Sequence, residues 1–108
     1  MNLSTHVLDT ARGEPAGGVL VHLYRWSGDD WIGVAQGRTG TDGRLHSWAP
    51  EPRWCRGTYR LCFDTAGYFG LGAFFPEVSV VFVVTDAWRH LHVPLLISPY
   101  GYSTYRGS

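Results

Sequence analysis

Turn-forming residues divide this chain into short segments, and this spacing restricts the possible folds more than any other feature of the sequence. The turn signals are Arg12–Pro15, Ser27–Asp30, Asp42–Gly43, Arg56–Gly57 and Ser98–Pro99. The segments between them are rich in Val, Leu, Tyr and Trp, which favour strands. Many short strands at such intervals are typical of a β-sandwich or a barrel, so we predict an all-β fold.

Alternation of apolar and polar side chains marks the individual strands. Within residues 58–64, every second side chain from Tyr59 to Phe63 is a large apolar one, which places these side chains on one face of a strand. Residues 77–85 are apolar on both faces, a pattern that predicts a strand covered on both sides. Two further strands are predicted at residues 18–26 and 31–38, joined by the turn at 27–30.

Only residues 64–71 could hold a helix, and that helix would be short. Asp64 or Thr65 can cap its beginning, and Gly70 or Gly72 can end it. We therefore expect one short helix between two strands of the sandwich.

The segment around His90 and His92 is the most informative part of the chain. Alternate residues from Leu91 to Ile97 form an apolar stripe that suits the core, so the two imidazoles point to the opposite face. Pro94 has no N–H to donate to a ladder, so we expect the strand to be interrupted there. Near the N-terminus the same alternation places His6 off the core.

Length and charge limit the classes of function. The 108 residues suit a single domain, residues 1–108. Nine basic and nine acidic residues give a net charge of zero, which argues against nucleic acid or an anionic membrane as a partner. Charged residues are only 17% while aromatics reach 15%, which indicates that part of the surface serves self-association. With no targeting segment and no long apolar run, we expect a cytoplasmic protein.

Several polar groups could carry chemistry, and each also has a plain structural explanation. His22 and His46 are interpreted as structural residues, and Arg44 after its turn as an exposed arginine. The spacing of His90 and His92 is that of two zinc ligands on a strand, but no third ligand lies nearby in the sequence, so we expect no metal. Cys55 and Cys62 are expected to remain thiols, because two cysteines make no disulfide framework. These patterns predict a sandwich with a histidine-bearing face and do not identify a substrate.

The order of motifs resembles the transthyretin family over essentially the whole chain. The resemblance is carried by Leu3–Thr10, Gly13–Ala16, Thr41–Arg44, Asp64–Phe69, Phe75–Val78 and His90–Ser108. The terminal Tyr105–Ser108 is similar to the ending that marks the family's 5-hydroxyisourate hydrolases and is absent from its hormone carriers. The resemblance implies two four-stranded sheets, about eight strands in all, with one short helix. It also implies a homotetramer, a dimer of dimers, whose substrate sites lie at subunit interfaces.

The resemblance further implies a function and a set of site residues. The expected activity is cofactor-free hydrolysis of 5-hydroxyisourate, a cyclic amide of urate degradation, to 2-oxo-4-hydroxy-4-carboxy-5-ureidoimidazoline. The catalytic residues would be His6, Arg44, His92 and Ser108, and the substrate-binding residues would be His6, Arg44, Tyr105, Arg106 and Gly107. His90 would support the site rather than catalyse. The alternatives are a transthyretin-like carrier of a small aromatic ligand, a zinc-binding sandwich and an interaction domain.

Overall fold

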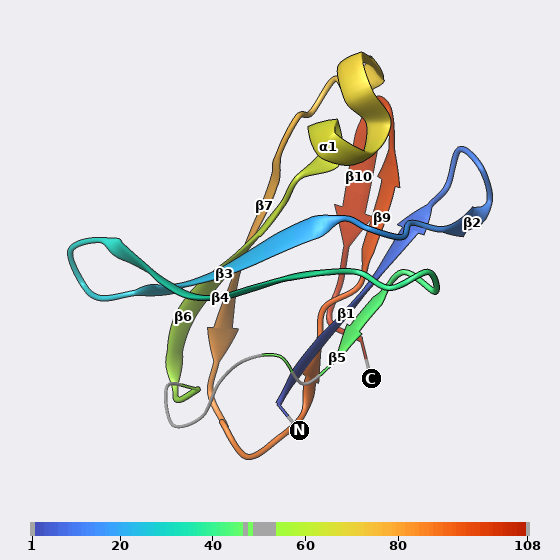
Figure 1. Ribbon diagram of the computed structural model, residues 1–108. Coiled ribbons are helices and arrows are strands. Elements are labelled where there is room, and N and C mark those ends of the chain that lie inside the picture. Colours follow the sequence, from blue (N-terminus) through green and yellow to red (C-terminus); the bar gives the residue numbers. More distant parts are fainter. Residues whose placement is uncertain (1, 47, 49–53, 108) are drawn as a thin grey trace.

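The computed structural model describes residues 2–46, 48 and 54–107 as two β-sheets and a short helix (Figure 1). One sheet contains β3 (Leu20–Trp26), β4 (Trp31–Arg38), β6 (Gly57–Phe63) and β7 (Val78–Val84). The other contains β1 (Leu3–Asp9), β2 (Glu14–Pro15), β5 (Arg44–His46), β8 (Leu91–His92), β9 (Leu95–Ser98) and β10 (Gly101–Thr104). Helix α1 (Thr65–Phe69) and a 3-10 turn, η1 (Gly70–Gly72), lie at one end, at the top of Figure 1.

The first sheet is antiparallel throughout, in the order β4-β3-β6-β7. The predicted hairpin of β3 and β4 is confirmed, and its turn is closed by a 2.9 Å hydrogen bond from Ser27 N to Asp30 O. This sheet therefore has the four strands that the sequence led us to expect.

The second sheet has six strand segments rather than four, because its outer positions are shared. Strands β8 and β9 follow one another along one side of β1, both parallel to it, while β2 and β5 pair antiparallel with β1. The order β10-β9-β1-β2 still describes four positions across the sheet. The prediction of about eight strands thus agrees with the architecture once the short segments that share a position are taken together.

The interruption predicted at Pro94 is confirmed, since β8 ends at His92 and β9 begins at Leu95. Two threonines satisfy the backbone there. The Thr5 hydroxyl donates to Val93 O at 2.6 Å, and the Thr104 hydroxyl donates to Pro94 O at 2.8 Å. The break therefore leaves these two carbonyls paired, although the ladder is lost.

The core lies between the inner faces of the two sheets. Tyr59, Leu61 and Phe63 of β6 are fully buried, as their alternation predicted, and they belong to the same apolar cluster as Leu95 and Ile97 of β9. Burying such side chains is the main stabilising contribution in a domain of this size.

The predicted helix is confirmed, together with both of its ends. The Asp64 carboxylate accepts a 2.9 Å hydrogen bond from Gly67 N, and Gly70 ends the helix with a φ of 72°. Tyr68 donates from its hydroxyl to the buried Asp9 carboxylate at 2.9 Å and so ties the helix to β1. No helix among the described residues is long and apolar enough to cross a membrane.

Strand β7 differs from its prediction, because one of its faces is open in this chain. Val81 and Val83 are 57% and 63% exposed, and β7 is the last strand of its sheet. The prediction that both faces are covered is wrong for the single chain, since Val81 and Val83 stay exposed when all described residues are in place. Cys55 and Cys62 form no disulfide, as predicted.

Candidate functional site

Strand β1 brings three of the predicted site residues to one outer face of the second sheet. Ser4 pairs with His92 in the parallel β1–β8 register, and His6 pairs with Arg44 in the antiparallel β1–β5 register. Paired residues of neighbouring strands point to the same face. His6 and His92 are half-buried while Arg44 is exposed, so the cluster is open on its outer side.

The turn before β5 fixes the orientation of His6. Gly43 has a φ of 76°, and its carbonyl accepts a 2.8 Å hydrogen bond from Val7 N. The neighbouring carbonyl of Asp42 lies 3.0 Å from His6 Nε2. Because a carbonyl can only accept, His6 Nε2 carries hydrogen and its Nδ1 is the nitrogen available for other partners.

We expect Gly43→Ala to disturb the site as well as the fold. An alanine pays about 1–2 kcal/mol for this left-handed conformation, and its Cβ would overlap the Val7 carbonyl oxygen. Gly18→Ala is the matched control, because Gly18 has a φ of 75° and nothing within 4 Å of an added Cβ. The temperature of thermal unfolding and the activity of the site should both fall further for Gly43→Ala than for Gly18→Ala. Equal losses in the two variants would refute the role of this turn in positioning His6.

The ring of His92 is held on two edges. Its Nδ1 lies 2.7 Å from the Ser4 hydroxyl. On the opposite edge, a Cβ added to Gly107 would lie 2.6 Å from His92 Cδ2, so only glycine fits there. Gly107 also donates from its backbone N to His92 O at 2.8 Å. Ser4 and Gly107 therefore fix the ring of His92 from two sides.

The surroundings keep His92 neutral near pH 7. Burial lowers the pKa of His92 below its ordinary value of 6.5, and electrostatic interaction with Arg44, His6 and His90 lowers this pKa further. A neutral imidazole can accept a proton, so His92 has the protonation state that a general base requires.

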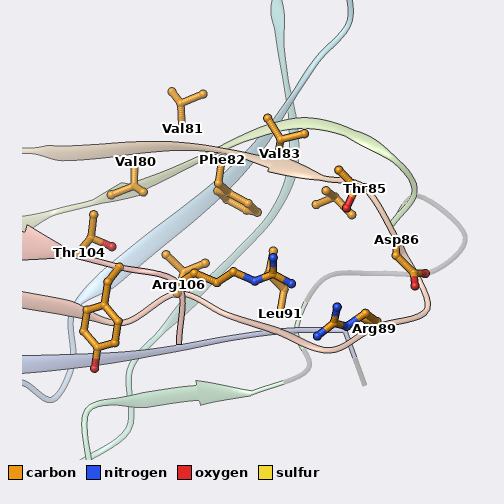
Figure 2. Close-up of a pocket in the computed structure, with 13 residues that line it drawn as sticks. Val80, Val81, Phe82, Val83, Thr85, Asp86, Arg89, Leu91, Thr104 and Arg106 are labelled. Carbon is orange, nitrogen blue, oxygen red and sulfur yellow. The ribbon is translucent and has the colours of Figure 1, made fainter. Parts of the chain in front are cut away.

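The terminal residues divide between two places. Gly107 lies against His92, whereas Arg106 extends into a separate cavity of about 360 Å³ (Figure 2). This cavity is also lined by β7 and by Leu91, which points away from the face that carries His92. Tyr105 borders the cavity and is 59% exposed. The predicted site residue Ser108 lies outside the described residues.

Sequence reasoning missed Ser4, which joins the two histidines of the last segment. Its hydroxyl lies 2.8 Å from Nε2 of the exposed His90 as well as 2.7 Å from Nδ1 of His92. A signal was present, because Ser4 stands two residues before His6 and therefore on the same strand face. Among the residues that the structure describes, no group of three His, Cys, Asp or Glu side chains could hold a metal ion.

Comparisons with known proteins identify relatives of this chain. A 5-hydroxyisourate hydrolase of Salmonella dublin is 46% identical over 98% of this chain and 80% of its own length. The 5-hydroxyisourate hydrolase 2 of Rhizobium meliloti is also 46% identical, over 98% of this chain and 95% of its own length. A crystal structure of sea bream transthyretin in complex with thyroxine superimposes with a TM-score of 0.91 at 31% identity, covering 99% of this chain and 95% of that one.

The match to a family model extends over nearly all of the chain. Residues 3–107 match the model described as HIUase/Transthyretin family. This span contains both sheets, the helix and the face that carries His6, Arg44 and His92. The chain therefore belongs to the HIUase/transthyretin family.

Proposed function

We propose that this chain hydrolyses 5-hydroxyisourate to 2-oxo-4-hydroxy-4-carboxy-5-ureidoimidazoline, as a cyclic amide hydrolase of urate degradation. The observation that carries the proposal is the cluster of His6, Arg44 and His92 on one open sheet face, in a chain 46% identical to proteins named 5-hydroxyisourate hydrolase. The reaction consumes one water and needs no cofactor. The cytoplasm is the proposed location.

In the proposed mechanism, His92 is the base that activates water. Its Nε2 takes a proton as the water oxygen bonds to a ring carbonyl carbon of the substrate. Arg44 binds the planar substrate and stabilises the oxyanion that develops on that carbonyl, because its guanidinium is a fixed positive fork. The carbon–nitrogen bond then breaks, and the departing nitrogen receives a proton from one of the two imidazoles, His6 or His92.

The tail completes the proposed site. We assign Ser108 a catalytic role in orienting the water or a histidine, and we assign Tyr105, Arg106 and Gly107 to substrate binding. Support comes from Gly107, whose contact with His92 brings the end of the chain to the imidazoles. Because Arg106 occupies a different cavity within one chain, its contact with substrate would be made at a site shared between subunits.

A homotetramer built as a dimer of dimers is the proposed assembly, with substrate sites at its interfaces. In the part of the chain that the structure describes, β7 is an edge strand of one sheet and β10 is an edge strand of the other. Val81 and Val83 on β7 and Tyr102 on β10 are large apolar side chains that remain exposed in the single chain. Light scattering after gel filtration should give the mass of four chains.

The direct test follows the decay of the substrate. We would generate 5-hydroxyisourate from urate with urate oxidase, add the purified protein, and compare the absorbance decay with the spontaneous rate. Faster decay at substoichiometric protein, unchanged by a chelator, is the expected result. Decay at the spontaneous rate would refute the hydrolase and favour the carrier of a small aromatic ligand.

The pH dependence of turnover is expected to follow His92. The base must be neutral, and its lowered pKa keeps it neutral below the ordinary histidine value of 6.5. We therefore expect kcat/KM to fall on the acid side with a midpoint below pH 6.5. A steady-state pH profile measures this, and a fall that is half complete above pH 7 would contradict the assignment.

A further inference from the structure

The Ser4 hydroxyl joins the imidazole of His92 to that of His90, a residue that the proposed mechanism does not use. Ser4 is 5% exposed, and its Oγ lies 2.7 Å from His92 Nδ1 and 2.8 Å from His90 Nε2. Both distances are those of hydrogen bonds. Ser4 and His92 are paired in the parallel register of β1 and β8, so the backbone pairing brings the two side chains together.

Counting hydrogens limits what this bridge can do. A serine hydroxyl has one hydrogen to donate and two lone pairs that accept. It therefore donates to at most one of the two imidazoles, and the other ring must donate to Ser4 Oγ. If Ser4 donates to His90, then His92 donates from Nδ1 and its Nε2 carries a lone pair. If Ser4 donates to His92 instead, Nε2 of that ring carries hydrogen and accepts no proton from water.

The proposed mechanism selects the first arrangement, because only there can Nε2 of His92 take a proton from water. His90 is exposed, so its Nδ1–H can be solvated by water while its Nε2 accepts from the buried hydroxyl. The hydrogen bonds then run in one direction, from His92 through Ser4 to His90, and such aligned chains strengthen one another. In this arrangement the hydrogens of Ser4 Oγ and His92 Nδ1 both meet an acceptor.

We propose that Ser4 and His90 are positioning residues that hold His92 in the Nδ1–H tautomer, so that its Nε2 is bare and able to take a proton from water. This inference rests on the proposed function, because only a base at His92 requires the bare nitrogen. The neutral ring that the surroundings favour makes the choice of tautomer decisive, since a neutral imidazole has one basic nitrogen.

Other charged and titratable groups border the bridge and enter its test. His6 lies on β1 two residues from Ser4, and Arg44 pairs with His6. His46 of β5 pairs in register with Ser4. These three residues stay unchanged in every variant proposed below, so their charges are common to all measurements.

The first measurement is the tautomer of His92 by nitrogen-15 NMR of the imidazoles in the full-length protein. The expected spectrum shows hydrogen on Nδ1 and a bare Nε2, with this preference lost in Ser4→Ala. Thr10→Val is the matched control, because Thr10 donates to Ile97 O between β1 and β9 and should leave the His92 spectrum unchanged. Hydrogen on Nε2 in the unmodified protein, or the same tautomer in Ser4→Ala, would overturn the proposal.

The second measurement is turnover of 5-hydroxyisourate. Ser4→Ala and His90→Leu should lower kcat by about tenfold, a part of the ~10²- to 10⁴-fold that a general base supplies, with little change in KM. His90→Gln should recover most of the loss, because its amide oxygen can accept from Ser4. His90 is exposed, so its variants test the bridge even if Ser4→Ala does not fold.

The two measurements separate failure of this inference from failure of the proposed function. If the unmodified protein does not hydrolyse 5-hydroxyisourate, the proposed function is wrong, and the NMR comparison still decides whether Ser4 sets the tautomer. If the protein is active and His90→Leu turns over normally, the function stands and the positioning role is refuted.

Discussion

Replacing His92 with Asn should lower kcat by about 10²- to 10⁴-fold, the range that a positioned general base contributes. Asparagine keeps a polar side chain beside Ser4 and Gly107 but has no basic nitrogen at the tip of the side chain. Because His92 is only half-buried on the outer face of the sheet, the core should be unaffected. The decay of 5-hydroxyisourate measures turnover, while circular dichroism and gel filtration confirm that fold and assembly persist.

His22→Asn provides the matched control for this loss. His22 is also a half-buried strand histidine, but it lies on β3 of the other sheet, stacked on Tyr24 with ring centroids 6.1 Å apart. Its replacement should leave turnover unchanged. Near-normal activity in His92→Asn would remove His92 from the mechanism, whatever the control shows.

Deleting Arg106–Ser108 should abolish most activity, with a loss of at least about 10²-fold, the cost of removing one transition-state donor. The deletion removes the proposed catalytic Ser108, and it also removes the Gly107 contact that holds the Cδ2 edge of His92. β10 and its hydrogen bonds to β9 remain, so the sheet should keep its stability. Turnover and thermal unfolding are measured together.

A point variant separates the packing of the tail from its chemistry. Gly107→Ala keeps Ser108 but places a methyl 2.6 Å from His92 Cδ2, so the ring must turn and kcat should fall. Gly101→Ala on β10 is its control, because the nearest atom to an added Cβ there is Ser98 Oγ at 3.8 Å. A truncated protein with normal turnover would show that the tail has no part in the chemistry.

Much of the fold was accessible from local pattern alone. The alternation from Tyr59 to Phe63 predicted a buried face because a strand has a strict two-residue period. The helix ends were predictable since Asp64 supplies an N-cap oxygen and Gly70 a left-handed φ. Pro94 signalled the break because it has no N–H. Each of these features depends on residues that are neighbours in the sequence.

The local sequence pattern could predict neither the register between distant strands nor what covers the outer face of a sheet. Nothing in a single sequence states that Ser4 pairs with His92, because that pairing depends on how distant strands align. For the same reason the bridge through Ser4 was missed, although the off-core face of β1 was recognised. The apolar outer face of β7 was taken as covered, since a hydrophobicity pattern does not distinguish a layer of the same chain from one supplied by another molecule.

The parallel pairing of β1 with β8 and β9 has a consequence for how the protein forms. The hydrogen bonds that join Ser4 with His90 and His92 span 86 and 88 residues, so β1 and its parallel partner β8 lie far apart in the sequence. Contacts of such high sequence separation make folding slow, because the chain loses the entropy of closing a long loop before the contacts contribute any stabilisation. Recovery of turnover during refolding should therefore lag behind the burial of Tyr59 in the antiparallel sheet that contains β3, β6 and β7. The catalytic face forms only when β1 has paired with β8, a strand 88 residues away in the sequence.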